Sequence, residues 1–271
     1  MTTTGDAPFD RPVVLRGGTV LTMDAARTVL TDTDVLVVDD RIAEVGRHLA
    51  VPQGTTEIDA GGGVVMPGMI DTHRHMWQTA MRGYGADWTL TQYFVWYYLE
   101  HGVRFRPEDV HAGNTLAALE ALEAGVTTVV DWSHGLRTPD HADAAADALL
   151  NAPGRYVLAY GNIQQAPAEW TATPEFRAFV ERHRDNDRLG LQVAFDVTGD
   201  PDFPERPAFE VARELGLAVT THAGVWGATG DNGIKLMYEN GFMGPETVYV
   251  HAASLSEDSY QRSAPTGGPV S

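Results

Sequence analysis

Up to Gly62 the chain shows short runs of strand-forming residues that alternate with turn-forming residues. The runs cover residues 13–15, 19–21, 35–38 and 41–45. Gly17-Gly18 and Asp39-Asp40 lie between runs, and both dipeptides are typical of tight turns. The pattern therefore predicts a small module of antiparallel strands at the start of the chain.

From Val64 onwards, apolar runs alternate with longer segments of helical periodicity. The expected strands are 64–70, 127–131, 156–160, 191–197, 218–221 and 248–250, and the expected helices are 107–124, 140–150, 174–183, 209–215 and 233–240. Such alternation predicts a parallel sheet that is covered by helices. Residues 266–271 resemble the entry to a further strand, so the sheet read from the sequence is an open one.

The composition narrows the class of protein. Of the 271 residues, 43% are hydrophobic, which is enough for a substantial core. A formal net charge of −18 disfavours binding to nucleic acid or to anionic membranes. The absence of cysteine leaves His, Asp and Glu as metal ligands and fits a cytoplasmic protein. No apolar stretch approaches the length of a membrane span, and residues 1–10 lack the apolar core of a secretory signal.

The run Pro67–His75, which reads Pro-Gly-Met-Ile-Asp-Thr-His-Arg-His, carries the strongest chemical signal. On a strand, residues two apart point to the same face, so His73 and His75 can bind one ion together. An isolated pair of this kind is more often an ordinary surface or core pair. His222 and His251 each follow an apolar run, at the strand ends where the active face of a parallel barrel forms.

Several motifs occur in an order and spacing that resemble one enzyme superfamily. They are Pro67–His75, Gln78, Arg82-Gly83, Glu123–Asp131, Thr221-His222-Ala223 and Val250-His251-Ala252. The chain is similar, from Val13 to its last residue, to the metal-dependent amidohydrolases. The branch that it resembles holds the cytosine, guanine, 8-oxoguanine and S-adenosylhomocysteine deaminases and the triazine chlorohydrolases.

The resemblance implies an α/β fold, a (β/α)₈ TIM-type barrel beside a small β-sandwich. Residues 1–63 would form part of the sandwich, and residues 64–271 would form about six βα units of the barrel. In the family the eighth strand ends in a metal-binding Asp, and a C-terminal segment completes the sandwich. Neither is found in the sequence, so we interpret the chain as a fragment; the alternative is that something else supplies the missing part.

The resemblance also implies roles for individual residues. His73, His75 and His222 would bind one divalent metal ion, Zn²⁺ or Fe²⁺. His251 would either join them or hydrogen-bond the attacking water, and we expect it to be catalytic. Asp71 would orient a ligand. The strand 191–197 lacks the Lys that bridges two metals in binuclear members, which favours a single ion.

Four residues are candidates for substrate contacts. Gln78 follows the His pair at a position where the resembled enzymes hold the substrate. Trp77 and Trp88 belong to an aromatic cluster that could stack on a planar ring, although such clusters more often form core. His134 follows the expected second strand and would point toward the active face.

One position departs from the family pattern and bears on the expected function. Deaminases of this family place a proton-shuttling Glu three residues after the third His, where this chain has Val225. We expect a metal-dependent hydrolase that cleaves a non-peptide C–N bond, or a C–halogen bond, of a small planar substrate. The alternative is a non-catalytic truncated chain, with or without metal. The expected partner is a small molecule, and the sequence is compatible with a homo-oligomer.

Overall fold

The computed structural model describes residues 11–225 and 229–271. The chain divides into two compact units, Met1–Gly68 and Met69–Ser271. The boundary falls five residues later than the predicted end of the first module, because the short strand β5 (Val64–Val65) pairs with β1 (Val13–Leu21) of the first unit.

The first unit is one five-stranded sheet. Its other strands are β2 (Val29–Val38), β3 (Arg41–Gly46) and β4 (Thr56–Asp59), and the order is β3-β2-β1-β4 with β5 also on β1. β1, β2 and β3 pair antiparallel, which confirms the predicted hairpin at Asp39-Asp40. β4 and β5 run parallel to β1, so the sheet is mixed rather than antiparallel as predicted.

The predicted turn at Gly17-Gly18 is wrong. β1 continues through both glycines, and the register with β2 shifts on either side of Gly18. Gly17 takes a left-handed φ of +67°, which glycine adopts without steric cost. A Cβ on Gly18 would lie 2.8 Å from the Val65 side chain, so only glycine fits there. The pair therefore forms a bulge inside a strand, and not a hairpin.

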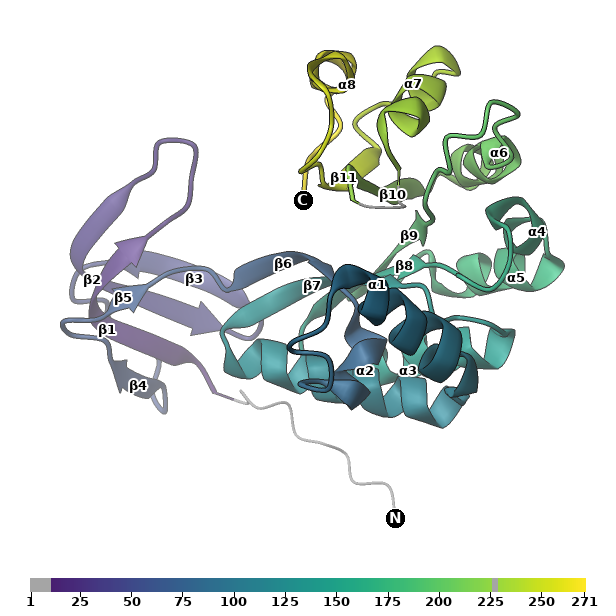
Figure 1. The fold of residues 1–271 in the computed structure, drawn as a ribbon. Helices are drawn as coiled ribbons and strands as arrows, with labels where there is room; N and C mark the ends of the chain where they lie inside the picture. The colour runs from purple at the N-terminus through teal and green to yellow at the C-terminus, as the bar shows by residue number, and fades with distance from the viewer. Residues whose placement is uncertain (1–10, 226–228) are drawn as a thin grey trace. The chain divides into compact units, whose positions relative to one another are not determined.

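The second unit is built on six parallel strands that follow each other in chain order. They are β6 (Met69–Arg74), β7 (Val126–Ser133), β8 (Arg155–Tyr160), β9 (Leu189–Ala194), β10 (Ala218–Ala223) and β11 (Thr247–His251). Sequential parallel strands with intervening helices are the arrangement of a (β/α) barrel. The predicted fold, an incomplete barrel of TIM type, is confirmed (Figure 1).

Helices connect these strands along one side of the sheet (Figure 1). They are α2 (Pro107–Glu123), α3 (Pro139–Asn151), α4 (Pro167–Thr171), α5 (Pro174–His183), α6 (Arg206–Leu215), α7 (Asp231–Glu239) and α8 (Glu257–Ser263). Four of them begin at a proline, a residue that suits this position because it lacks the N–H that the first helical turn leaves unpaired. The five predicted helices are confirmed to within three residues at each end.

The aromatic segment after β6 forms short, irregular helices. They are the 3₁₀-helix η1 (Met76–Met81), α1 (Leu90–Tyr93), the π-helix η2 (Phe94–His101) and the 3₁₀-helix η3 (Gly102–Arg104). Trp77, Tyr97 and Tyr98 are buried in the main core of the unit, between the sheet and its helices. A smaller cluster of Trp132, Ala159, Ala194 and Val250 fills the other face of the sheet.

The edge of the sheet beside β11 is extended by the last residues of the chain. Tyr249 donates its N–H to the Pro269 carbonyl, and Ser271 donates to the Tyr249 carbonyl. Val270 thereby forms a parallel bridge with Tyr249, in the direction that a seventh strand would take. The hydroxyls of Ser271 and of Thr72 in β6 lie 2.7 Å apart, so the two edges of the curved sheet meet at this point.

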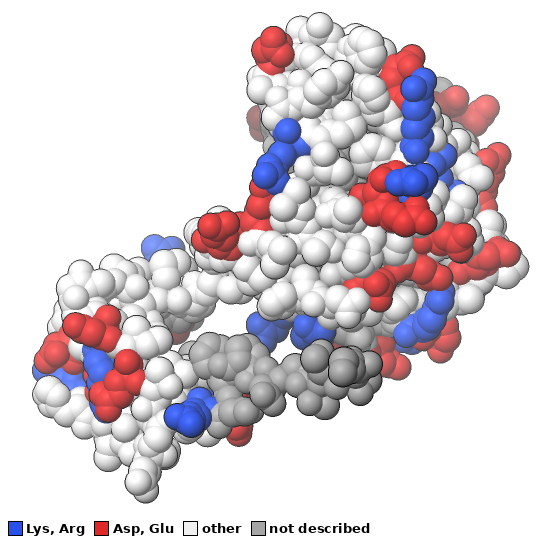
Figure 2. Space-filling model, turned by 90° about the horizontal axis from the view of Figure 1, so that it is seen from below, with Lys and Arg blue, Asp and Glu red and all other residues white. Residues whose placement is uncertain are grey.

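Charged side chains cover the outside of the helices. Figure 2 shows Asp and Glu side chains with Arg and Lys side chains beside them. Arg177 pairs with Glu214 between α5 and α6 at 2.8 Å, and Arg262 pairs with Asp258 within α8 at 2.7 Å. Among the described residues, no helix is both long and apolar enough to cross a membrane.

Candidate metal centre and substrate pocket

Four histidines converge at the carboxyl ends of three strands. His73 is in β6 and His75 directly follows it, His222 is in β10, and His251 ends β11. Side chains at these strand ends share one face of a parallel barrel. The ring centroid of His73 lies 4.7 Å from that of His75, 5.1 Å from that of His222 and 5.2 Å from that of His251.

The tightest set of candidate ligand atoms differs from the predicted one. Within the described part of the chain, atoms of His73, His222 and His251 all lie within 4.8 Å of one another. His75, which we expected as a ligand, is not in this set, although its ring centroid lies 4.7 Å from that of His73 and 5.4 Å from that of His222. The structure thus brings all four rings together, and the geometry alone admits either His75 or His251 as a third ligand.

Two of the four rings are oriented by hydrogen bonds behind them. The His75 Nδ1–H donates to the carbonyl oxygen of Trp132 at 2.8 Å. The His222 Nδ1–H donates to the Asp196 carboxylate at 2.9 Å, and the same oxygen accepts the His222 backbone N–H. Each bond leaves the Nε2 lone pair unprotonated, which is the arrangement of metal-bound histidines.

The surroundings of His73, His75 and His251 keep these three imidazoles neutral. Burial, with the neighbouring histidines, lowers the pKa of His73 to about 2. Burial and the nearby His222 lower the pKa of His75 to about 3. Burial also lowers the pKa of His251, with His222 again contributing. Because a metal ion needs unprotonated ligands, the donor set fits a divalent metal cation.

Asp71, which we expected to orient a ligand, contacts the backbone of His73 and not its ring. Its Oδ1 accepts the N–H of His73 at 3.1 Å. The segment just past His75 is held from the other side by Asp131, which is fully buried and accepts the Met76 N–H at 2.9 Å. Asn114 donates to the second oxygen of Asp131 at 3.1 Å. The two carboxylates therefore fix the backbone on both sides of His75.

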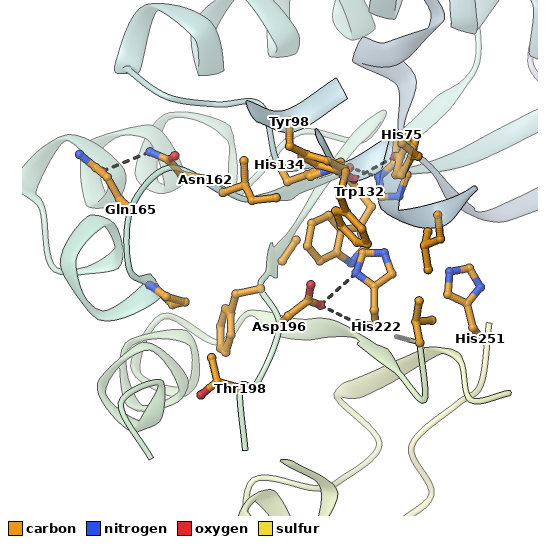
Figure 3. A pocket seen from close by; sticks show the side chains of 18 residues that line it. His75, Tyr98, Trp132, His134, Asn162, Gln165, Asp196, Thr198, His222 and His251 are labelled. Atoms are coloured by element: carbon orange, nitrogen blue, oxygen red, sulfur yellow. Dashed lines mark hydrogen bonds and ion pairs between the residues drawn. The ribbon is translucent and has the colours of Figure 1, made fainter. Parts of the chain in front are cut away.

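A cavity of about 310 Å³ opens beside His75, His222 and His251 (Figure 3). Its wall is largely aromatic and apolar, and its other lining residues are Leu90, Tyr93, Phe94, Tyr98, Trp132, His134, Asn162, Ile163, Gln165, Pro167, Ala194, Phe195, Asp196, Thr198 and Val225. A wall of this kind accommodates a small planar molecule, with a few polar groups that fix its orientation.

The predicted substrate contacts separate into two groups. His134 lies in the pocket wall. Gln78, Trp77 and Trp88 are not among the lining residues of this pocket. The Oε1 of Gln78 accepts a hydrogen bond from the hydroxyl of Tyr93 at 2.8 Å, so Gln78 helps to fix Tyr93, which lines the pocket. Trp77 is buried against His134, and Trp88 packs on Tyr84 and Tyr97 at the outer side of the aromatic segment.

Val225 lines the cavity together with His222 and His251. An apolar side chain therefore lines the cavity three residues after His222, where the sequence resemblance led us to compare Val225 with a proton-shuttling Glu. The next residues, 226–228, lie outside the described part of the chain.

Sequence reasoning missed two residues of the site. Asp196 follows β9 and orients His222, and Trp132 both accepts the His75 hydrogen bond and packs its ring 4.3 Å from that of His222. Asp196 had one available signal, since it is an acidic residue placed just past an apolar strand, where the active face of a parallel barrel forms. Trp132 had none, because its carbonyl would act whatever the side chain, and its ring packs on a histidine of a strand far along the chain.

Comparison with known proteins shows which family this chain is similar to. The model of the amidohydrolase family matches residues 64–257. The chain is 30% identical over 278 residues to the 5-methylthioadenosine/S-adenosylhomocysteine deaminase of Symbiobacterium thermophilum, covering 95% of this chain and 62% of that protein. It is 26% identical to the 5'-deoxyadenosine deaminase of Methanosarcina acetivorans, covering 90% of this chain and 58% of that protein.

Solved structures show the same fold at lower sequence identity. A triazine hydrolase variant aligns with a TM-score of 0.76 at 19% identity, over 96% of this chain and 65% of that one. The guanine deaminase of C. acetobutylicum aligns with a TM-score of 0.73 at 13% identity, over 96% of this chain and 67% of that one. The chain spans about three fifths of the length of the curated relatives that it matches. By the match over residues 64–257, it belongs to the amidohydrolase family.

Proposed function

We propose that this chain forms the metal-binding and substrate-binding face of a hydrolase that replaces an amino group on a small planar heterocycle by water. The observation that carries the proposal is the convergence of four histidines, in or just after β6, β10 and β11, beside one aromatic cavity. The curated relatives are named as adenosine-type deaminases, which supports C–N bond hydrolysis.

The proposed ligands are His73, His75 and His222, holding one Zn²⁺ or Fe²⁺. His75 and His222 each have a hydrogen bond behind the ring, which is usual for metal-bound histidines, whereas none to the ring of His73 or His251 is found in the part of the chain that the structure describes. His73 is included because its ring lies within 5.1 Å of the rings of both His75 and His222. When bound, a divalent ion acidifies water and polarises the carbon that is attacked.

The remaining residues would bind the substrate and move protons. His251 borders the cavity, and its lowered pKa keeps it unprotonated, so its ring can take a proton from the attacking water and pass it to the leaving amine. Tyr93, Phe94 and Phe195 give the wall aromatic surfaces on which a planar ring can stack. The same surfaces exclude bulk water from the reacting groups.

The orienting role of Asp196 gives a first prediction. We expect Asp196→Ala to weaken zinc binding about 10- to 100-fold, because the His222 ring loses the acceptor that fixes it. Asp196→Asn, whose side-chain oxygen can still accept the Nδ1–H, should weaken it much less. Competition titration with a zinc-sensitive dye measures both affinities. Equal affinity in Asp196→Ala and the unaltered chain would contradict the orienting role.

Ammonia release tests the proposed reaction. The chain, loaded with Zn²⁺ or Fe²⁺, is incubated with 5'-deoxyadenosine, 5'-methylthioadenosine, guanine and cytosine, and ammonia is measured enzymatically. We expect release from at least one compound and none from a His222→Ala control that folds normally. A folded, metal-loaded chain that releases no ammonia from any of them would favour the alternative, a metal-binding chain without catalytic activity.

A further inference from the structure

Trp77 packs directly behind His134, on the side away from the cavity. Its indole Nε1 lies 3.3 Å from His134 Nδ1, and the two rings meet at 77°. Trp77 is only 1% exposed, and it is held in place by close neighbours. A Cβ added to Gly135 or to Gly102 would come within 3.1 Å of the Trp77 ring, so the indole has little room to turn.

The position of the proton on His134 follows from the two groups that face Nδ1. One is the Trp77 N–H, which can only donate, and the other is the Trp132 carbonyl oxygen at 3.1 Å, which can only accept. The Trp132 oxygen already accepts the shorter bond from His75, at 2.8 Å. The Trp77 N–H makes no other hydrogen bond within the described residues.

A proton on Nδ1 would therefore set two N–H groups against each other and leave a buried indole N–H unpaired, which is costly. A lone pair on Nδ1 lets Trp77 donate to it, while the Trp132 oxygen keeps its bond from His75. The neutral ring then carries its proton on Nε2. That nitrogen is buried and makes no hydrogen bond with any described residue.

We infer that Trp77 holds His134 in the Nε2–H form, and that His134 thereby donates a hydrogen bond to an acceptor atom of the bound heterocycle. His134 belongs to the wall of the cavity, beside His75 and Tyr98 (Figure 3), so its N–H can reach a bound ring, and the acceptor is a ring nitrogen. The second half of this inference rests on the proposed function. Trp77 is then a positioning residue and His134 a specificity-determining one.

Nitrogen NMR tests the first half on the free chain. In a sample labelled with ¹⁵N-histidine, the His134 signals are assigned as those that disappear in His134→Gln. We expect Nε2 protonated and Nδ1 unprotonated. In Trp77→Phe the proton should move to Nδ1, because the Trp132 carbonyl becomes the remaining partner. A proton on Nδ1 in the unaltered chain, or an unchanged tautomer in Trp77→Phe, would overturn the role of Trp77. The spectrum of the unaltered chain decides the tautomer even if Trp77→Phe does not fold.

Binding of adenine and its deaza analogues tests the second half. The 1-, 3- and 7-deazaadenines each replace one ring nitrogen by C–H. We expect one of them to bind the unaltered chain about 5- to 10-fold more weakly than adenine does. His134→Phe should remove that difference, whereas His134→Gln, which keeps an N–H donor, should retain most of it.

A difference that persists in His134→Phe, equal binding of all four bases, or no binding of adenine would each overturn the assignment of His134 as donor to a ring acceptor. Neither measurement requires turnover. A chain that releases no ammonia can still give the expected tautomer and binding pattern, and an active chain can fail both, so this inference and the proposed reaction fail separately.

Discussion

Val225→Glu is expected to raise the rate of ammonia release by about 100-fold or more. Val225 lines the cavity together with His222 and His251, so a carboxylate at this position would lie in the wall from which protons must be exchanged. General acid–base catalysis by a positioned side chain contributes about 10²- to 10⁴-fold to a rate. The chain as it stands has an apolar side chain there, which can carry no proton.

The control for this experiment is Val225→Gln. Glutamine has nearly the shape of glutamate but does not ionise, so it separates proton transfer from changes in packing or polarity. Initial rates of ammonia release are compared at equal metal content. The account predicts a gain for the glutamate variant alone. An equal gain with glutamine, or no gain with either, would show that Val225 does not occupy the position of a proton shuttle.

Asp131→Ala is expected to lower the free energy of unfolding by about 3–5 kcal/mol. Burial raises the pKa of Asp131 to about 7, against hydrogen bonds that include those from Met76 and Asn114. Removing the carboxylate leaves both donors unpaired in the core, and each unpaired buried donor costs about 1–3 kcal/mol. The backbone just past His75 would also lose its anchor.

Asp131→Asn is the matched control. The Oδ1 of Asn114 is buried without a hydrogen-bond partner. If the Asn114 amide rotates by half a turn, its oxygen can accept a hydrogen bond from the amide NH₂ of the introduced asparagine. The side-chain oxygen of that asparagine can still accept the Met76 N–H. We expect a loss of about 1 kcal/mol or less. Urea unfolding measures both variants, and similar losses in the two would contradict the network described here.

Much of the barrel could be predicted from the alternation of strands and helices. The helix 174–183 was predicted to the residue, because its periodic apolar positions begin at a proline and end at polar residues. The curling of the sheet into a barrel was predicted from the family resemblance, since periodicity does not indicate how the strands are ordered in space. The first module was predicted less well. β4 was missed because its four residues are exposed and offer no alternation. Gly18 was misread as a turn residue because the reason for a glycine there, the close approach of the Val65 side chain, lies far along the chain.

For the site, the sequence indicated which histidines gather, because each follows an apolar run at a strand end. Their separate roles could not be predicted, because these depend on what lies behind each ring. His75 and His222 have hydrogen-bond acceptors there and His134 has a donor, and these groups come from other strands or from the aromatic segment. Trp77 was expected to touch substrate because of its residue type, and the sequence could not indicate that it is buried against His134, the contact on which its inferred positioning role rests.

The central claim is that the histidines of β6 and β10 hold a metal ion, and elemental mass spectrometry on purified, monodisperse chain tests it most directly. The account predicts about one Zn or Fe per chain, and near-background metal in a folded His73→Ala, His222→Ala double variant. A folded chain that retains no metal after incubation with either ion, or a double variant that retains as much as the unaltered chain, would contradict the account.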